Sequence, residues 1–386
     1  MSNARKILAL ATAAAACTSF VGCGENTKWI AEFNGEKINA GVYLYYELAA
    51  YNNVLSYLQT TDKTVTEVTK DDVYYIEDTK ETVNAYEWIQ SKAMEDLRTF
   101  CMVEAEYDRL QLELTEAEEA EVEEMVAYYC DTLGYRENYE DNGISEESLI
   151  TVYQNNYKYS NLFFAIYGTY EKIGEDGKTT EIEGERYVDD ETVWNHYTEH
   201  NVRVKVIEFP LFGENSAALT DEEKEEVTLT AEEYLTRAED GEDFDALIEE
   251  YKEATSEEEE EETTEETDET EEEDEYEYET IVSDESTSYS EAVVDKLFEL
   301  QLDENGEAVE LITDTDVNNK IYLVKKYDLR EREDLFEEQH DSLLADLVGE
   351  EYDDYLADLV ANQLTLNVNQ DAVDRYVPKK LVLELK

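Results

Sequence analysis

The sequence predicts an α+β protein: a helical domain built from both ends of the chain, with a small antiparallel sheet and its helices inserted between them. Helical periodicity dominates residues 40–200. Strand-like runs then open and close the following region, at Val202–Phe212 and Lys320–Tyr327. Helical periodicity returns from Arg330, and that last helix would leave its apolar stripe in water unless it packed on the first helices.

The first 23 residues predict a targeting segment that is not part of the fold. Arg5 and Lys6 precede an apolar, alanine-rich run, Ile7–Val21, which is too short for a comfortable membrane span. Gly22 then precedes Cys23, and this resembles a bacterial lipoprotein signal, whose cysteine becomes lipidated. We therefore expect an extracytoplasmic protein anchored to the bacterial cell membrane through Cys23. An ordinary cleaved signal peptide is the alternative.

Residues 24–200 predict the helical N-terminal domain. It opens with a β-hairpin around Asn34-Gly35, the strongest two-residue turn signal, and Asn39 can cap the helix that follows. Further helices are expected at 40–58, 81–112, 115–133, 145–167 and 190–200, with a loop at 60–78 and a small hairpin within 168–187. Cys101 and Cys130 fall inside helices, where either a disulfide or two unpaired buried thiols would fit.

Residues 201–329 predict the inserted domain. Its strands are expected at 202–212, 308–312 and 320–327, with two helices within 230–251 that break at Gly241. Asp243 can cap the second of these helices. An acidic insert, residues 255–280, interrupts the domain. Its part from 256 to 280 holds 17 acidic residues in 25 and no basic one, so we expect it to be disordered.

The C-terminal segment, residues 330–386, is expected to pack on the N-terminal domain. Its pattern predicts a long helix at 330–364, a strand at 364–368 and a short helix that Pro378 terminates.

The charge of the chain excludes nucleic acid as a partner. The formal net charge is −71, from 101 acidic against 30 basic residues, whereas a phosphate backbone requires Lys and Arg. A solvated acidic surface that resists aggregation is the simplest interpretation. Such a surface is also expected to attract calcium loosely, without a defined site.

No metal or cofactor site is predicted. His196 and His200 are four residues apart on one helix but lack a third ligand. Asp314, Asp316 and Asn318 have the first ligand spacings of an EF-hand, but the loop lacks its glycine and its final glutamate, so a turn between strands is favoured.

Several short motifs occur in the order and spacing of one family. The chain resembles the extracytoplasmic foldases of the SurA and PrsA type over almost all of its length beyond Cys23. The motifs that carry the resemblance are Phe33–Ile38, Asn142–Glu147, Val193–His200, Gly241–Phe244, and Leu297–Leu300 followed by Gly306-Glu307. The resemblance implies a helical chaperone domain with an inserted parvulin-type peptidyl-prolyl isomerase domain.

The catalytic motifs of that family are absent here. Val206 stands where the first parvulin strand usually has a histidine, and Lys320 or Tyr322 is nearest to the histidine of the last strand. Tyr289 and Val293 are the nearest matches to the proline pocket, with Phe298 behind them. Since Val206 can neither donate nor accept a hydrogen bond, the resemblance implies a parvulin-like domain with weak or no isomerase activity, and no catalytic residue is assigned.

The predicted function is therefore a membrane-anchored foldase that binds unfolded or partly folded exported proteins. Many tyrosines in the helical part offer amphipathic contact area for such clients, although about half are expected to be core residues. Two alternatives remain: an active isomerase that uses unusual residues, and a non-enzymatic acidic cell-surface or cation-binding lipoprotein.

Overall fold

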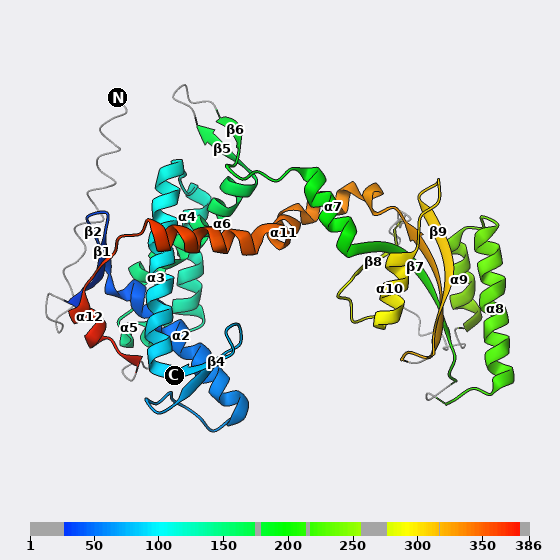
Figure 1. The fold of residues 1–386 in the computed structure, drawn as a ribbon, viewed down its shortest axis with the longest axis horizontal. Helices are drawn as coiled ribbons and strands as arrows, with labels where there is room; N and C mark the ends of the chain where they lie inside the picture. Colours follow the sequence, from blue (N-terminus) through cyan, green and yellow to red (C-terminus); the bar gives the residue numbers. More distant parts are fainter. Residues whose placement is uncertain (1–26, 174–178, 214–216, 256–275, 316, 379–386) are drawn as a thin grey trace. The chain divides into compact units, whose positions relative to one another are not determined.

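The chain divides into two compact units in the computed structural model, which describes residues 27–173, 179–213, 217–255, 276–315 and 317–378 (Figure 1). Unit 1 consists of Met1–Tyr187 and Val348–Lys386, and unit 2 of Val188–Leu347. Helix α11 (Glu333–Asn362) begins in unit 2 and ends in unit 1. Among the described residues, no helix combines the length and apolar character needed to cross a membrane. The predicted signal peptide and Cys23 lie outside the described residues.

Three long helices form the core of unit 1, and each contacts the other two: α2 (Ala40–Thr61), α3 (Ala85–Leu110) and α6 (Glu146–Tyr167). Each begins at a side chain that accepts hydrogen bonds from the first turn, namely Asn39, Asn84 and Ser145. The expected cap at Asn39 is thereby confirmed. The Cys101 and Cys130 thiols are both buried and unpaired, in different apolar clusters.

The shorter elements of unit 1 connect these helices. They are α4 (Glu116–Ala127), the π-helical turn η2 (Tyr128–Thr132), α5 (Arg136–Asp141), and the hairpins β3–β4 (Val73–Ile76, Glu81–Asn84) and β5–β6 (Thr169–Ile173, Thr179–Glu183). The predicted loop at 60–78 was wrong at both ends, since α2 runs to Thr61 and β3 begins at Val73. The predicted helix from residue 81 starts instead at Ala85, because Glu81–Asn84 pairs with β3.

The two ends of the chain meet in one sheet of unit 1. Strand β1 (Trp29–Phe33) lies between β2 (Glu36–Asn39) and β11 (Asn367–Val368), and Ala31 pairs with Val368. Asn34 and Gly35, both at positive φ, form the β1–β2 turn as predicted. The short helix α12 (Gln370–Arg375) contacts β1. The prediction that both ends of the chain build one domain is confirmed.

Unit 2 contains a four-stranded antiparallel sheet in the order β8-β7-β10-β9 (Figure 1). The strands are β7 (Asn201–Pro210), β8 (Thr280–Ser283), β9 (Glu307–Asp314) and β10 (Lys320–Tyr327). Helices α8 (Asp221–Glu239) and α9 (Phe244–Thr255) cover one face, and α10 (Glu291–Glu299) packs on the other. Gly241, at φ +86°, breaks α8 from α9, and Asp243 accepts a hydrogen bond from the first turn of α9, as predicted. The α+β fold class is confirmed.

The structure places more of the chain in unit 2 than the predicted range 201–329. Helix α7 (Asp190–His200) and the beginning of α11 also belong to it. They are held together by Trp194 and Phe336, whose rings stack with centroids 4.0 Å apart. The short 3-10 helix η4 (Leu329–Glu331) joins β10 to α11.

The predicted bounds of the disordered insert, residues 255–280, include residues of the neighbouring helix and strand. Thr255 is the last residue of α9, and Thr280 opens β8. Just before β8, the Glu279 carboxylate accepts hydrogen bonds from the guanidinium groups of Arg203 and Arg332. These partners order the end of the acidic run. Residues 256–275 lie outside the described residues.

Candidate functional site

The candidate site is the sheet face beneath α10. Side chains alternate between the faces of a strand, so Val204, Val206 and Glu208 of β7 share one face. Val324 lies opposite Val206, and Tyr322 lies opposite Glu208, which places both on that same face. The apolar members of this set pack against α10 in one cluster.

All five predicted cleft residues belong to this cluster: Val206, Tyr289, Val293, Phe298 and Tyr322. Val293, on α10, and Tyr322, on β10, are only 1% and 2% exposed, while the other three are half-buried. Tyr289 precedes the first residue of α10, whereas Phe298 lies near its end and lines a separate cavity of about 380 Å³. The accessible part of the predicted cleft is therefore limited to Val206 and Tyr289 over Tyr322.

The polar groups around Val206 are the phenols of Tyr289 and Tyr322 and one ion pair. The Tyr289 ring meets the Tyr322 ring edge-on, with centroids 5.6 Å apart. Lys320 Nζ lies 2.5 Å from Glu208 Oε2. Burial, with the nearby Glu208 carboxylate, raises the pKa of Tyr322 to about 12 and also raises that of Tyr289. Both phenols therefore remain protonated near neutral pH and can donate hydrogen bonds.

Lys326 holds the far end of α10 on the sheet. Its Nζ donates to the carbonyl oxygens of Leu297 and Leu300, both at 2.9 Å. These are carbonyls at the C-terminal end of a helix, where a cation is favoured. Burial lowers the pKa of Lys326. The position of α10, and with it that of Tyr289, is thus fixed by a buried ammonium group.

The three histidines of the chain lie on α7 and α11, away from this cluster. The rings of His196 and His200 are tilted against each other with centroids 4.7 Å apart, and His200 Nδ1 lies 2.7 Å from Asp284 Oδ2. In the part of the chain that the structure describes, no group of three or more His, Cys, Asp or Glu side chains could hold a metal ion.

The segment with partial EF-hand spacing joins β9 to β10. Asp314 accepts from the backbone N–H of Val317 at 3.0 Å and from Asn318 Nδ2 at 3.1 Å. Asp316 lies outside the described residues. The Asp314 carboxylate therefore stabilises the turn between the last two strands.

The opposite face of β7 carries charges that sequence reasoning missed. Arg203 and Lys205 are 5% and 6% exposed. The Arg203 guanidinium pairs with Glu279 at 2.5 Å, and Lys205 Nζ lies 2.6 Å from Asp245 Oδ2. The available signal was a basic residue at alternate positions of an otherwise apolar strand. Their partners lie 40 or more residues away, so the pattern alone could not identify them.

The comparisons with known proteins show a distant structural likeness. No protein-family model matches the sequence, and no curated protein matches it. The chain is similar to the crystal structure of foldase protein PrsA from Streptococcus pneumoniae, with 15% sequence identity over 79% of this chain and 91% of that one, and a TM-score of 0.25.

Proposed function

We propose that this protein is a foldase of the chaperone type: it binds non-native segments of exported proteins, and its unit 2 is a parvulin-like domain with weak or no isomerase activity. In this proposal the chain is anchored to the bacterial cell membrane through a lipidated Cys23. The observation that carries the proposal is the sheet face beneath α10, where Val206, Tyr289 and Phe298 are only partly buried and no histidine belongs to the apolar cluster.

The cleft favours binding over catalysis. Rotation about a prolyl amide meets a barrier of about 18–20 kcal/mol in simple amides, and a catalyst must bind the twisted amide better than the planar one. Val206 offers only apolar contact on this face, and Val324 opposite it is buried. The two phenols lie at one end, and Tyr322 is almost fully buried. A proline ring could rest on this surface without a hydrogen-bond network to stabilise the twisted amide.

Exposed apolar side chains in unit 1 also support client binding. Tyr128 and Leu133, at the π-helical turn η2, are 51% and 42% exposed. By contrast, Tyr43 and Tyr51 are 0% and 3% exposed and belong to the core. The tyrosines of the helical part therefore divide between core packing and surface, and the exposed ones offer amphipathic contact area.

Two assays on the chain without its first 22 residues test the proposal. The first follows light scattering of reduced, denatured lysozyme, and we expect the protein to suppress aggregation at comparable molar amounts. The second is a protease-coupled assay with a proline-containing peptide, and we expect no acceleration over the uncatalysed rate. Turnover that Tyr289→Ala abolishes while Tyr187→Ala does not would establish an active isomerase instead. Failure to suppress aggregation would remove the chaperone proposal.

A further inference from the structure

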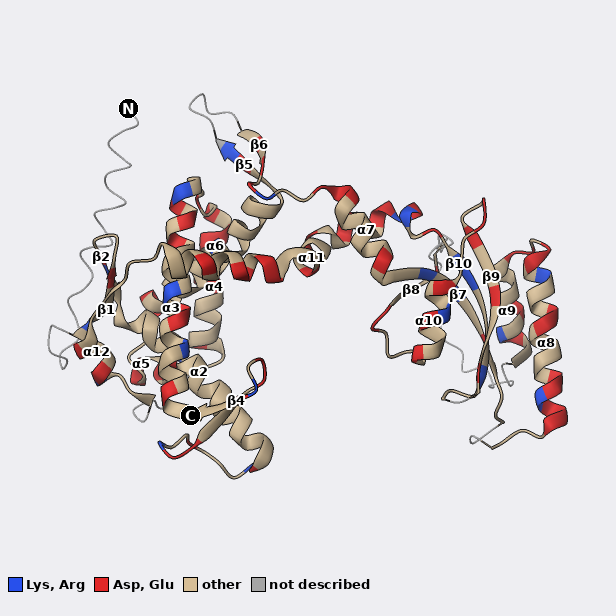
Figure 2. Ribbon diagram, in the orientation of Figure 1, with Lys and Arg blue, Asp and Glu red and all other residues tan. Residues whose placement is uncertain are grey.

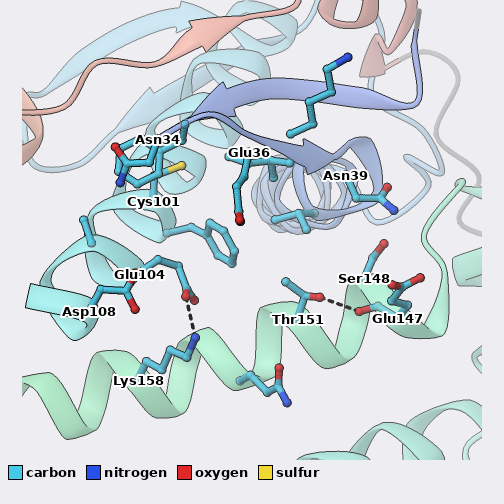
Figure 3. Close-up of a pocket in the computed structure, with 17 residues that line it drawn as sticks. Asn34, Glu36, Asn39, Cys101, Glu104, Asp108, Glu147, Ser148, Thr151 and Lys158 are labelled. Carbon is cyan, nitrogen blue, oxygen red and sulfur yellow. Dashed lines mark hydrogen bonds and ion pairs between the residues drawn. The ribbon is translucent and has the colours of Figure 1, made fainter. Parts of the chain in front are cut away.

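Unit 1 contains a pocket of about 610 Å³ that the predicted function does not use (Figure 3). The β1–β2 hairpin forms one wall, and helices α3 and α6 form the others. Its apolar lining comes from Phe33, Ile38, Val42, Phe100 and Ala105. The pocket is thus an elongated, partly apolar groove beside a short strand, within one compact unit.

The pocket has an excess of negative charge. Lys158 Nζ lies 2.6 Å from Glu104 Oε2, so this lysine already neutralises one carboxylate. Three further carboxylates line the pocket, those of Glu36, Asp108 and Glu147. None of them has an ion pair within the described residues. In Figure 3, Glu36 is directed from the hairpin into the pocket, while Asp108 and Glu147 lie on opposite sides of it.

The remaining cation at the pocket is engaged elsewhere. Lys37 Nζ lies 4.6 Å from the centroid of the Trp29 ring, in a cation–π contact. The cation–π contact leaves the charge of Lys37 in place, so the lining, with four carboxylates and two ammonium groups, has an excess of two negative charges. A basic group would complement them.

The strand beside the pocket has an open edge. Among the described residues, β2 pairs only with β1, because the sheet order is β11-β1-β2. An edge strand presents unpaired backbone N–H and C=O groups, and an extended peptide can pair with them. In Figure 3, β2 is the strand of the hairpin nearer the pocket. A peptide paired with β2 would therefore direct every second side chain toward the groove.

We propose that this groove binds an extended segment of non-native polypeptide as an added strand on β2. Lys or Arg side chains of that segment are selected by Glu36, Asp108 and Glu147, and an apolar side chain two residues away packs on Ile38 and Phe100. This inference rests on the proposed function and names its preferred client: extended chain in which a basic residue and an apolar residue are two positions apart and so face the groove together.

Binding of a labelled peptide to the chain without its first 22 residues tests the inference. The probe is a short fluorescein-labelled peptide that repeats Lys-Thr-Val-Thr, so that lysine and valine two positions apart share one face. Its binding is followed by fluorescence anisotropy. A peptide with glutamate in place of lysine should not bind. Replacing carboxylates by amides in Glu36→Gln, Asp108→Asn and Glu147→Gln should each weaken binding roughly two- to fivefold. Glu123→Gln, an exposed change on α4 outside the pocket, is the matched control and should leave affinity unchanged.

Hydrogen exchange distinguishes strand addition from mere charge attraction. Bound peptide should slow amide exchange in Glu36–Asn39, and N-methylation of alternate peptide bonds in the probe should remove this protection. Equal affinity of the triple amide variant and the unchanged protein would overturn the inference, as would protection confined to other segments. If lysozyme aggregation is still suppressed in that case, the proposed function survives. If neither peptide nor client binds, both fail.

Discussion

Glu279→Gln tests whether a buried ion network holds the end of the acidic run and unit 2 together. The Glu279 side chain is 4% exposed and lies between two guanidinium groups, at 2.5 Å from Arg203 and 2.9 Å from Arg332. An amide at this position keeps the shape but removes the negative charge. The two buried arginines would then face each other with one fewer counter-charge.

The expected cost follows from what remains around the arginines. Removing one partner of a buried pair usually costs about 3–5 kcal/mol. Arg203 would keep Glu331 at 3.0 Å, and Arg332 would keep Asp334 at 2.7 Å. Both carboxylates are 60% exposed and therefore compensate only partly. We expect a loss near the lower end, about 3 kcal/mol, which is a large fraction of the stability of an ordinary domain.

Urea unfolding followed by tryptophan fluorescence measures this loss. Trp194 lies in unit 2, and the substitutions Trp29→Phe and Trp88→Phe remove the signals of unit 1. Glu277→Gln, two residues away and exposed, is the control for charge alone. A loss of less than about 1 kcal/mol for Glu279→Gln, or an equal loss for the control, would refute the reasoning, since exposed pairs contribute only that much.

Three further outcomes are expected. Tyr352→Ala should lower the free energy of unfolding of unit 1 by about 3–5 kcal/mol, because the Tyr352 side chain is 1% exposed and packs on Phe163. Thermal unfolding measures this loss of stability, and a loss below about 1 kcal/mol would contradict the packing. Arg237 lowers the pKa of Glu250 from 4.5 to about 2. The ionised Glu250 carboxylate therefore stabilises the fold above about pH 4.5, and this stabilisation is lost as the pH falls toward 2. The difference in melting temperature between the unchanged protein and Glu250→Gln should therefore stay constant from pH 7 to 5 and shrink below that; a difference that persists at pH 2 would exclude this pair as its source. Finally, a net charge of −71 predicts that the melting temperature rises with NaCl concentration, because salt screens the repulsion between like charges. The same rise in CaCl2 at matched ionic strength would indicate screening alone. A larger rise in CaCl2 would indicate specific calcium binding.

Local signals predicted most of the helices. Thr115 and Glu118 form a capping box at the start of the helix expected from residue 115, with the Glu118 carboxylate 2.6 Å from the Thr115 backbone nitrogen. Asn39 caps α2, and Asn34-Gly35 forms the first hairpin. These features depend on residues within a few positions of one another. A single sequence therefore carries enough information to place them.

Some missed features had a local signal, and others depend on distant partners. Strand β3 reads Val73-Tyr74-Tyr75-Ile76, whose β-branched and aromatic residues are typical of a strand, but the polar, threonine-rich stretch around it obscured the β3–β4 hairpin. From composition alone, Glu279 was predicted to be one more solvated acid in a disordered segment. Its order comes from Arg203, which is 76 residues away. Charge composition alone cannot distinguish a solvated carboxylate from one that is buried between two arginines.

The groove of unit 1 was missed for a related reason. Glu36 belongs to the hairpin, Asp108 to α3 and Glu147 to α6. Each was read as one acid among 101 on a solvated surface. What distinguishes them is the absence of a counter-charge among the described residues around a shared cavity, and that is visible only after three segments of the chain are brought together.

The two faces of β7 differ in how strongly packing constrains their side chains. On one face Arg203 and Lys205 are buried in ion pairs that link β7 to α9 and to the end of the acidic run, so a substitution there would leave an uncompensated buried charge. On the other face Val206 is half-buried at the end of the cluster and makes only apolar contacts. The side chain at position 206 is therefore weakly constrained by packing. In the parvulin-like domain proposed above, an isopropyl group could therefore replace an imidazole at this position with little cost to the sheet.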